Sequence, residues 1–162
     1  MWERDAFPSL LPRHAIVLKQ SLLRTPCYGW YARKMRMIAI DRSAGAKAIR
    51  TMAAEAGRAL DENRPIVIFP EGTRRKPGAT ADYKPGVAAL YALLKVPCVP
   101  VAHNSGLFWS GFWKRPGTLL VEVLEPIPPG LPPRKFSEAL HPPLRPPTHR
   151  HLAAAPGKPI PD

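Results

Sequence analysis

Short apolar runs recur along the chain and predict a series of β-strands. They cover residues 14–19, 37–41, 65–70, 96–102 and 118–124, and most are rich in Val and Ile. The run over 65–70 has a proline at each end and only apolar residues between them. This pattern is typical of a strand that is buried on both faces of a sheet.

Stretches with helical periodicity separate these runs. Apolar residues recur at helical spacing from Ser43, a candidate N-cap, to about residue 63, and again over 87–94. Residues 21–34 are predicted to be helical in part, with a break near Pro26 and Gly29. Alternating strands and helices predict an α/β fold with a largely parallel sheet and helices on both faces.

A parallel sheet also predicts where a ligand binds. In such sheets ligands lie beyond the carboxyl ends of the strands. Four groups of polar residues follow predicted strands in this chain: Lys19, Asp41 with Arg42, residues 71–74 and residues 103–105. We therefore expect the functional site at this edge.

The hexapeptide FPEGTR at 69–74 is the sharpest local motif. Glu71, Thr73 and Arg74 cluster around Gly72 at the end of a predicted strand. An arginine there suits bidentate phosphate binding, and a glycine lets the backbone approach a ligand closely. The alternative is an ordinary turn with a local ion pair between Glu71 and Arg74.

Proline usage predicts the domain boundary. Of the 22 prolines, 12 lie in residues 126–162. Because proline removes a backbone donor and disfavours helix interiors, residues 128–162 are predicted to be a disordered Pro-rich tail, and residues 1–127 the folded domain. Cys27 and Cys98 lie in apolar stretches without paired spacing, which favours buried thiols over a disulfide or a metal site.

The positive charge points to an anionic partner. The formal net charge is +12, and residues 13–76 hold 14 Lys or Arg against five Asp or Glu, a net of +9. Within this segment Tyr28, Trp30 and Tyr31 lie beside Arg33 and Lys34. They could meet anionic lipid headgroups, or form a solvated face over core aromatics. No apolar run is long enough to span a bilayer.

Several motifs together resemble one family. FPEGTR at 69–74 is similar to the motif of the glycerolipid acyltransferases, specifically the 1-acyl-glycerol-3-phosphate (lysophosphatidate) acyltransferases. Residues 37–42, 84–88 and 99–102 resemble further blocks of that family in the same order. The resemblance covers roughly residues 14–127, and the combination is more specific than any one block.

The resemblance implies a reaction. An acyl group would pass from acyl-CoA or acyl carrier protein to the free hydroxyl of lysophosphatidate, giving phosphatidate, with no metal and no other cofactor. It assigns substrate binding to Arg42, Glu71, Gly72, Thr73 and Arg74. It further implies peripheral binding to an anionic membrane surface at the cytoplasmic face, and no nucleic-acid partner.

The sequence differs from the family pattern at the general base. The family uses a histidine followed five positions later by an acid, and none of the five histidines here has an acid at that spacing. Glu3 could be the acid of such a motif, with the histidine two positions before Met1, or an ordinary charged residue of a frayed terminus.

Two consequences follow from this departure. We expect a fold that is N-terminally truncated and a chain with impaired activity, because losing a general base costs roughly 10² to 10⁴ in rate. One alternative is a noncatalytic remnant that binds lipid phosphate or membrane. The other is a basic nucleic-acid-binding module, although no motif for that role accompanies the charge.

Overall fold

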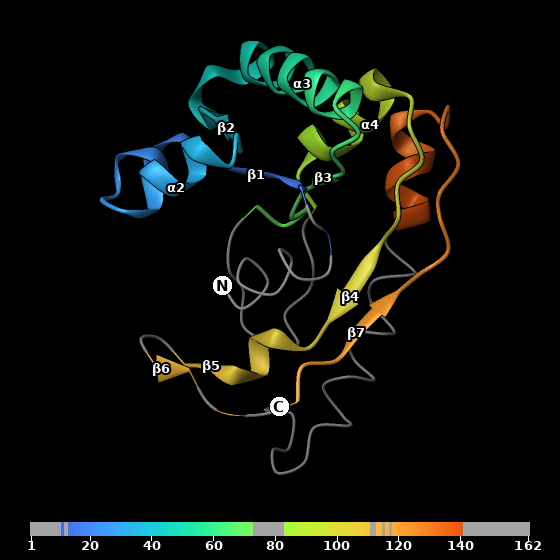
Figure 1. Cartoon of the computed structure of the whole chain (residues 1–162). Coiled ribbons are helices and arrows are strands. Elements are labelled where there is room, and N and C mark those ends of the chain that lie inside the picture. The colour runs from blue at the N-terminus through green and yellow to red at the C-terminus, as the bar shows by residue number, and fades with distance from the viewer. Residues whose placement is uncertain are drawn as a thin grey trace. The chain divides into compact units, whose positions relative to one another are not determined.

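A computed structural model of the chain describes residues 11, 13–72, 83–110, 113–114, 116 and 118–140. The chain divides into two compact units (Figure 1). The first comprises Met1–Pro70 and Pro85–Leu94, and the second comprises Glu71–Lys84 and Lys95–Asp162.

A three-stranded parallel sheet forms the centre of the first unit. Its strands are β1 (Ala15–Lys19), β2 (Ile38–Ile40) and β3 (Ile66–Val67), in the order β2-β1-β3. Val17 lies opposite Ile38 and Ala15 opposite Ile66. The predicted parallel arrangement is confirmed for these three strands.

The most buried strand is β1 and not β3. Residues 15–18 of β1 are all buried, whereas Ile66 and Val67 of β3 are half-buried. Within the described residues β3 pairs on one side only, while β1 pairs on both. The prediction of a doubly buried strand at 65–70 is therefore wrong, because a central position decides burial more than local composition does.

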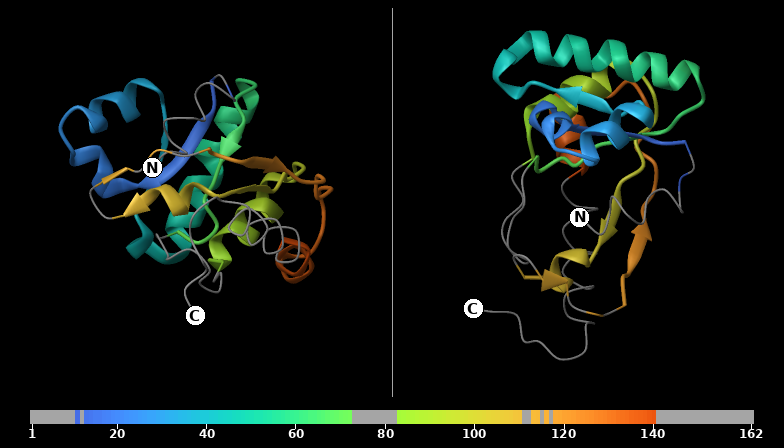
Figure 2. Two further views of the ribbon diagram at one scale, coloured as in Figure 1. Left: turned by 90° about the horizontal axis from the view of Figure 1, so that it is seen from below. Right: turned by 60° about the vertical axis from the view of Figure 1, so that its left-hand side comes forward.

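Two helices pack on one face of the sheet. They are α3 (Gly45–Asp61) and α4 (Pro85–Leu94). Figure 2 shows α3 and α4 side by side. Alternate strand residues and helix residues share a single core, as expected for side chains that alternate between the two faces of a strand. Its fully buried members are Ala15, Val17, Ile38, Met52, Ala56, Ala59 and Leu90. On the other face, Ile16 and Leu18 are also buried.

The start of α3 differs from the prediction. Ser43 is not its N-cap but the middle of a short 3-10 turn, η2 (Arg42–Ala44). The Ser43 side chain bonds to Asp41, and α3 follows at Gly45, whose φ of +51° is a conformation that glycine adopts without strain. Asp41 takes the capping role one turn earlier, since its carboxylate accepts the Ser43 amide.

The segment between β1 and β2 consists of η1 (Gln20–Arg24) and α2 (Tyr28–Lys34). The break between them spans 25–27, which confirms the predicted interruption near Pro26, whereas the predicted break near Gly29 is wrong because Gly29 lies inside α2. Cys27 lies there with a φ of +62° and is exposed. The predicted burial of this thiol is therefore wrong. Cys98 is half-buried, and burial raises its pKa.

The second unit contains antiparallel pairs. Strand β4 (Val101–His103) pairs with β7 (Val121–Val123), and β5 (Trp109–Ser110) pairs with β6 (Trp113–Lys114), with η3 (Ser105–Phe108) between β4 and β5. Among the described residues β4 pairs with β7 and with none of the three parallel strands, so the predicted parallel order is not seen to continue into β4.

Beyond residue 127 the chain continues with a helix over 133–140, in which Phe136 is only 1% exposed. The boundary at 127 remains a prediction, and residues 141–162 of the predicted tail lie outside the described residues. Among the described helices, none combines the length and the apolar character that a membrane span requires.

Candidate functional site

The carboxyl ends of β1 and β2 meet at one edge of the parallel sheet. Lys19, the last residue of β1, lies opposite Ile40, the last residue of β2. Asp41 and Arg42 follow Ile40 directly, so the two strands place a lysine, a carboxylate and the backbone of an arginine at the same edge. This is the edge at which parallel sheets bind ligands.

Asp41 is held in its charged form at this edge. Its Oδ1 accepts hydrogen bonds from the Ser43 hydroxyl at 2.5 Å and from the Ser43 amide at 3.0 Å. These bonds, the hydroxyl first, lower the pKa of Asp41 below its ordinary value, and the charge of Lys19 lowers it further. The carboxylate therefore fixes the turn that begins at Arg42.

The FPEGTR motif follows β3, but only its first four residues are described. Gly72 adopts a φ of +66°, the left-handed region that favours glycine, while its predicted close approach to a ligand remains a prediction. Glu71 is half-buried in a turn. Thr73 and Arg74 lie outside the described residues. Arg42 belongs to the first unit, whereas Glu71 and Gly72 belong to the second, and their joint role remains a prediction.

The general-base position is not described. Glu3 lies outside the described residues. His14 immediately precedes β1, at the amino end of the strand, and is fully buried, with its Nδ1 2.6 Å from the carbonyl oxygen of Leu11. This histidine is therefore at the opposite end of β1 from Lys19.

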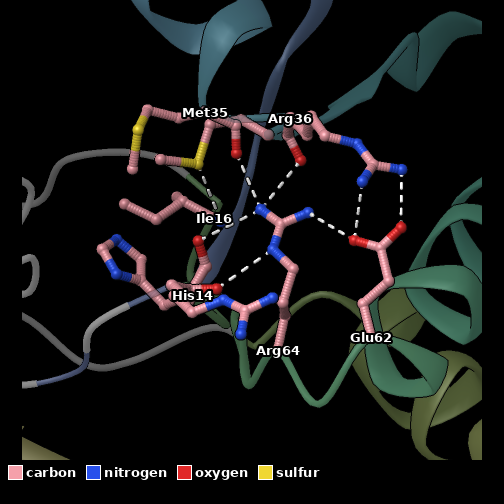
Figure 3. Close-up of polar contacts among 8 residues, drawn as sticks. His14, Ile16, Met35, Arg36, Glu62 and Arg64 are labelled. Atoms are coloured by element: carbon pink, nitrogen blue, oxygen red, sulfur yellow. Dashed lines mark hydrogen bonds and ion pairs between the residues drawn. The ribbon is translucent and has the colours of Figure 1, made fainter.

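A second polar cluster gathers at this opposite end of the sheet, around Arg64 (Figure 3). The buried guanidinium donates to the carbonyl oxygen of Arg13 at 3.0 Å and to that of Met35 at 2.7 Å. It also reaches the carbonyl oxygens of His14 and Arg36, at 3.4 and 3.3 Å.

Glu62 completes this cluster. Its carboxylate lies 3.6 Å from Arg64 and 2.6 Å from the exposed Arg36. All of these groups lie where β1, β2 and β3 begin. Because the guanidinium is occupied by backbone carbonyl groups, we assign the cluster to the stability of the fold rather than to ligand binding.

The polar residues after β4 also have structural partners. The side-chain oxygen of Asn104 accepts the Leu120 amide at 2.9 Å, and its amide nitrogen donates to the Thr118 carbonyl group at 3.3 Å. Ser105 Oγ lies 3.0 Å from His103 Nδ1. Asn104 thus ties the end of β4 to the chain that enters β7. The expectation of ligand-binding residues at 103–105 finds no support in these contacts.

Lys19 lies at this edge but is not among the residues to which the sequence motifs assign substrate binding. It stood among the polar residues that follow strands, but no motif marked it. Only the register between β1 and β2 places it beside Asp41 and Arg42. Among the described residues, no group of three or more His, Cys, Asp or Glu side chains could hold a metal ion.

Comparison with known proteins identifies a common family and fold. The family described as Acyltransferase matches residues 2–104. A 1-acyl-sn-glycerol-3-phosphate acyltransferase of Pseudomonas aeruginosa is 35% identical over 124 residues, covering 75% of this chain and 48% of the relative. The human 1-acyl-sn-glycerol-3-phosphate acyltransferase beta is 36% identical over 95 residues, covering 55% of this chain and 33% of the relative.

The fold has a counterpart among solved structures. The crystal structure of the 1-acyl-sn-glycerophosphate (LPA) acyltransferase PlsC from Thermotoga maritima superposes with a TM-score of 0.63 at 23% identity. The match covers 90% of this chain and 59% of that protein. The chain spans about half the length of the curated relatives that it matches.

Proposed function

Because the chain belongs to the Acyltransferase family, we propose that it serves the acylation of lysophosphatidate to phosphatidate. The names of the relatives from Pseudomonas aeruginosa and human support this substrate. The acyl donor would be the thioester of acyl-CoA or acyl carrier protein. The lipid substrate would lie in the cytoplasmic face of an anionic membrane, to which the chain binds peripherally.

The proposed step is direct acyl transfer. The free hydroxyl of lysophosphatidate attacks the thioester carbonyl carbon, an oxygen–carbon bond forms, and the carbon–sulfur bond breaks. The proton of the hydroxyl passes through a general base to the departing thiolate. No group is oxidised or reduced in this step, and no metal is needed. The proposal therefore requires of the chain a base, an anion site and correct orientation of the substrates.

The edge formed by β1 and β2 carries the proposal for the anion site. The single observation behind it is the pairing of Lys19 with Ile40, which places Lys19 next to Asp41 and Arg42. A lysine and an arginine at one sheet edge suit a phosphate dianion. For Glu71, Gly72, Thr73 and Arg74, the proposal rests on the sequence motif.

A binding measurement with the intact chain tests this anion site. We expect Lys19→Ala and Arg42→Ala each to weaken binding of lysophosphatidate about tenfold, since a hydrogen bond to a charged group contributes roughly 1.5–3 kcal/mol. The exposed Lys47 of α3 offers a matched control, and Lys47→Ala should leave binding unchanged. If all three variants lose affinity for lysophosphatidate to the same extent, the loss is due to net charge alone, and the proposal is contradicted.

Turnover is a separate question. Glu3 is proposed as the acid that orients a histidine base, and none of the histidines in the sequence has the required spacing to an acid. We therefore expect the printed polypeptide to bind lysophosphatidate but to show little acyl-CoA-dependent acylation. Binding without turnover supports a lipid-phosphate-binding role. Turnover at the level of the Pseudomonas aeruginosa relative would refute the predicted impairment.

A further inference from the structure

One face of α2 is exposed and combines aromatic rings with cations. Trp30 is 65% exposed and Tyr31 37%, while Arg33 and Lys34 are exposed beside them. Lys34 Nζ lies 4.9 Å from the centroid of the Trp30 ring. We refer to these four residues as the α2 face. An indole ring with a cation above it is an arrangement that suits the boundary between water and an apolar phase.

The side of α2 opposite to the α2 face packs on η1. The opposite side of α2 buries Gly29 and Ala32. The backbone of η1 lies so close to Gly29 that a Cβ atom there would be 2.1 Å from the carbonyl oxygen of Leu23. Helix α2 therefore packs backbone to backbone on η1, and its other side faces outward.

The electrostatics of this region favour an anionic partner. Residues 6–40 contain no Asp or Glu, and six Lys or Arg. Arg36 is paired with Glu62. Over the part of the chain that the structure describes, Arg24, Arg33 and Lys34 form no ion pair, so their charges are available to a partner.

The location connects the α2 face with the proposed anion site. Strand β1 ends at Lys19, η1 begins at Gln20, and α2 follows after three further residues. Helix α2 lies in the first unit beside the edge strand β2 (Figure 1). The exposed face and the lysine of the anion site are thus linked by one short, packed segment of the same unit.

We propose that the α2 face binds the surface of an anionic lipid bilayer. Trp30 and Tyr31 would lie at the level of the headgroups, and Arg24, Arg33 and Lys34 would contact lipid phosphates. Exposed aromatic rings beside cations also occur in proteins that bind single-stranded nucleic acid, where they line a groove that follows the strand. The choice of a bilayer over nucleic acid rests on the proposed function, in which the substrate is a membrane lipid.

Binding to vesicles tests the proposal directly. The intact chain is titrated with vesicles of phosphatidylcholine, with and without phosphatidylglycerol, in the absence of lysophosphatidate and acyl donor. We expect binding only to the mixed vesicles. The double variant Arg33→Glu/Lys34→Glu should weaken it more than about tenfold, since each cation near an anionic surface contributes about fivefold.

A matched control separates the surface from the net charge. Lys47→Glu/Arg50→Glu makes the same change of charge on the exposed side of α3. We expect this control to retain binding within about threefold, because Lys47 and Arg50 belong to α3 and not to the proposed contact surface. Equal losses in the two double variants, or no loss in either, would overturn the proposal.

The aromatic residues provide an independent readout. Brominated lipids in the mixed vesicles quench tryptophans that enter the interface, and Trp30→Phe identifies the share of Trp30 among the four tryptophans of the chain. We expect most of the quenching to disappear in Trp30→Phe. Quenching that is the same in both proteins would contradict the proposed contact.

Two further measurements complete the test. If single-stranded DNA at physiological salt binds the chain, and the Arg33→Glu/Lys34→Glu variant loses that binding while vesicle binding persists, the surface is a nucleic-acid site and the proposal fails. Far-UV circular dichroism of every variant checks that α2 still folds. Vesicle binding needs no turnover, so its outcome is independent of the acyl-transfer assay.

Discussion

The contact between Asp41 and Ser43 makes a prediction at the scale of single residues. Ser43→Ala removes the hydroxyl donor that lowers the pKa of Asp41 most, and leaves the amide donor in place. We expect the pKa of Asp41 to rise toward its ordinary value. A carbon-detected NMR titration of the carboxyl group measures this change, and an unaltered titration midpoint would contradict it.

The same contact has a defined effect on stability against pH. Because the folded-state pKa of Asp41 lies below the unfolded-state value, its contribution to stability is present above the unfolded-state pKa. This contribution is lost as the pH falls through the lowered folded-state value. Ser43→Ala should therefore lower the free energy of unfolding near neutral pH, and this difference should disappear as the pH falls below the folded-state pKa of Asp41.

Individual residues also show the limits of prediction from the sequence. The sequence predicted that Asp41 and Arg42 follow a strand, and they do follow the last residue of β2 at the edge of the sheet. The positive φ of Gly72 was not predicted, because a motif does not specify backbone angles. Lys19 acquired a role only through strand register, which depends on pairing between distant segments. The prediction of Ser43 as the N-cap of α3 is wrong. Serine and aspartate side chains both accept hydrogen bonds from backbone amides, and the sequence alone does not decide which of two neighbouring residues does so.

At the scale of elements, we expect alanine substitution of two helical glycines to change the free energy of unfolding in opposite directions. Gly29→Ala would place a Cβ atom 2.1 Å from the Leu23 carbonyl oxygen, and a backbone atom cannot move aside as a side chain can. We expect Gly29→Ala to lower the free energy of unfolding by roughly 1–3 kcal/mol, the usual cost of overpacking. Thermal and urea denaturation measure the change.

Gly57 in α3 is the matched control. Apart from the neighbouring residues and backbone of its own helix, no atom lies within 4 Å of a Cβ built at Gly57. Gly57→Ala should raise the free energy of unfolding by roughly 0.5–1 kcal/mol, because alanine restricts the unfolded chain more than glycine does. If both substitutions destabilise to the same extent, the close packing of α2 on η1 is not the cause.

The elements themselves were predictable to different degrees. Periodicity located the first three strands and α3, because each buries one face against the same core. The antiparallel pair of β4 with β7 was not predictable, since apolar alternation gives a strand but not its partner. Residues 133–140 form a helix inside the segment that the prolines assigned to the tail, because proline is compatible with the first turn of a helix.

At the scale of the whole molecule, Arg64 joins segments that are far apart in the sequence. One guanidinium binds carbonyl oxygens of Arg13 and Met35, which lie 51 and 29 residues away along the chain. These bonds fix where the strands of the sheet begin, and therefore which residues reach the opposite edge. Arg64, at the amino-terminal edge of the sheet, thus supports the strand register that places Lys19 opposite Ile40 at the carboxyl-terminal edge.

Substitution of Arg64 should therefore affect the whole first unit. Arg64→Met keeps the length of the side chain but removes the donor that these buried and part-buried carbonyl groups share, and we expect it to lower the free energy of unfolding by roughly 3 kcal/mol. Arg64→Lys should recover only part of this, because an ammonium group lacks the planar fork that reaches several carbonyls. Urea denaturation followed by circular dichroism measures both.

The exposed Arg36 provides the comparison that isolates the buried contacts. Its side chain is 65% exposed and pairs with Glu62, so Arg36→Ala removes a surface ion pair without changing the backbone carbonyl that Arg64 binds. Such pairs contribute about 0–1 kcal/mol, and we expect a loss in that range. A loss in Arg36→Ala as large as that in Arg64→Met would mean that the ion pair, and not the hydrogen bonds to the backbone, holds the three segments together.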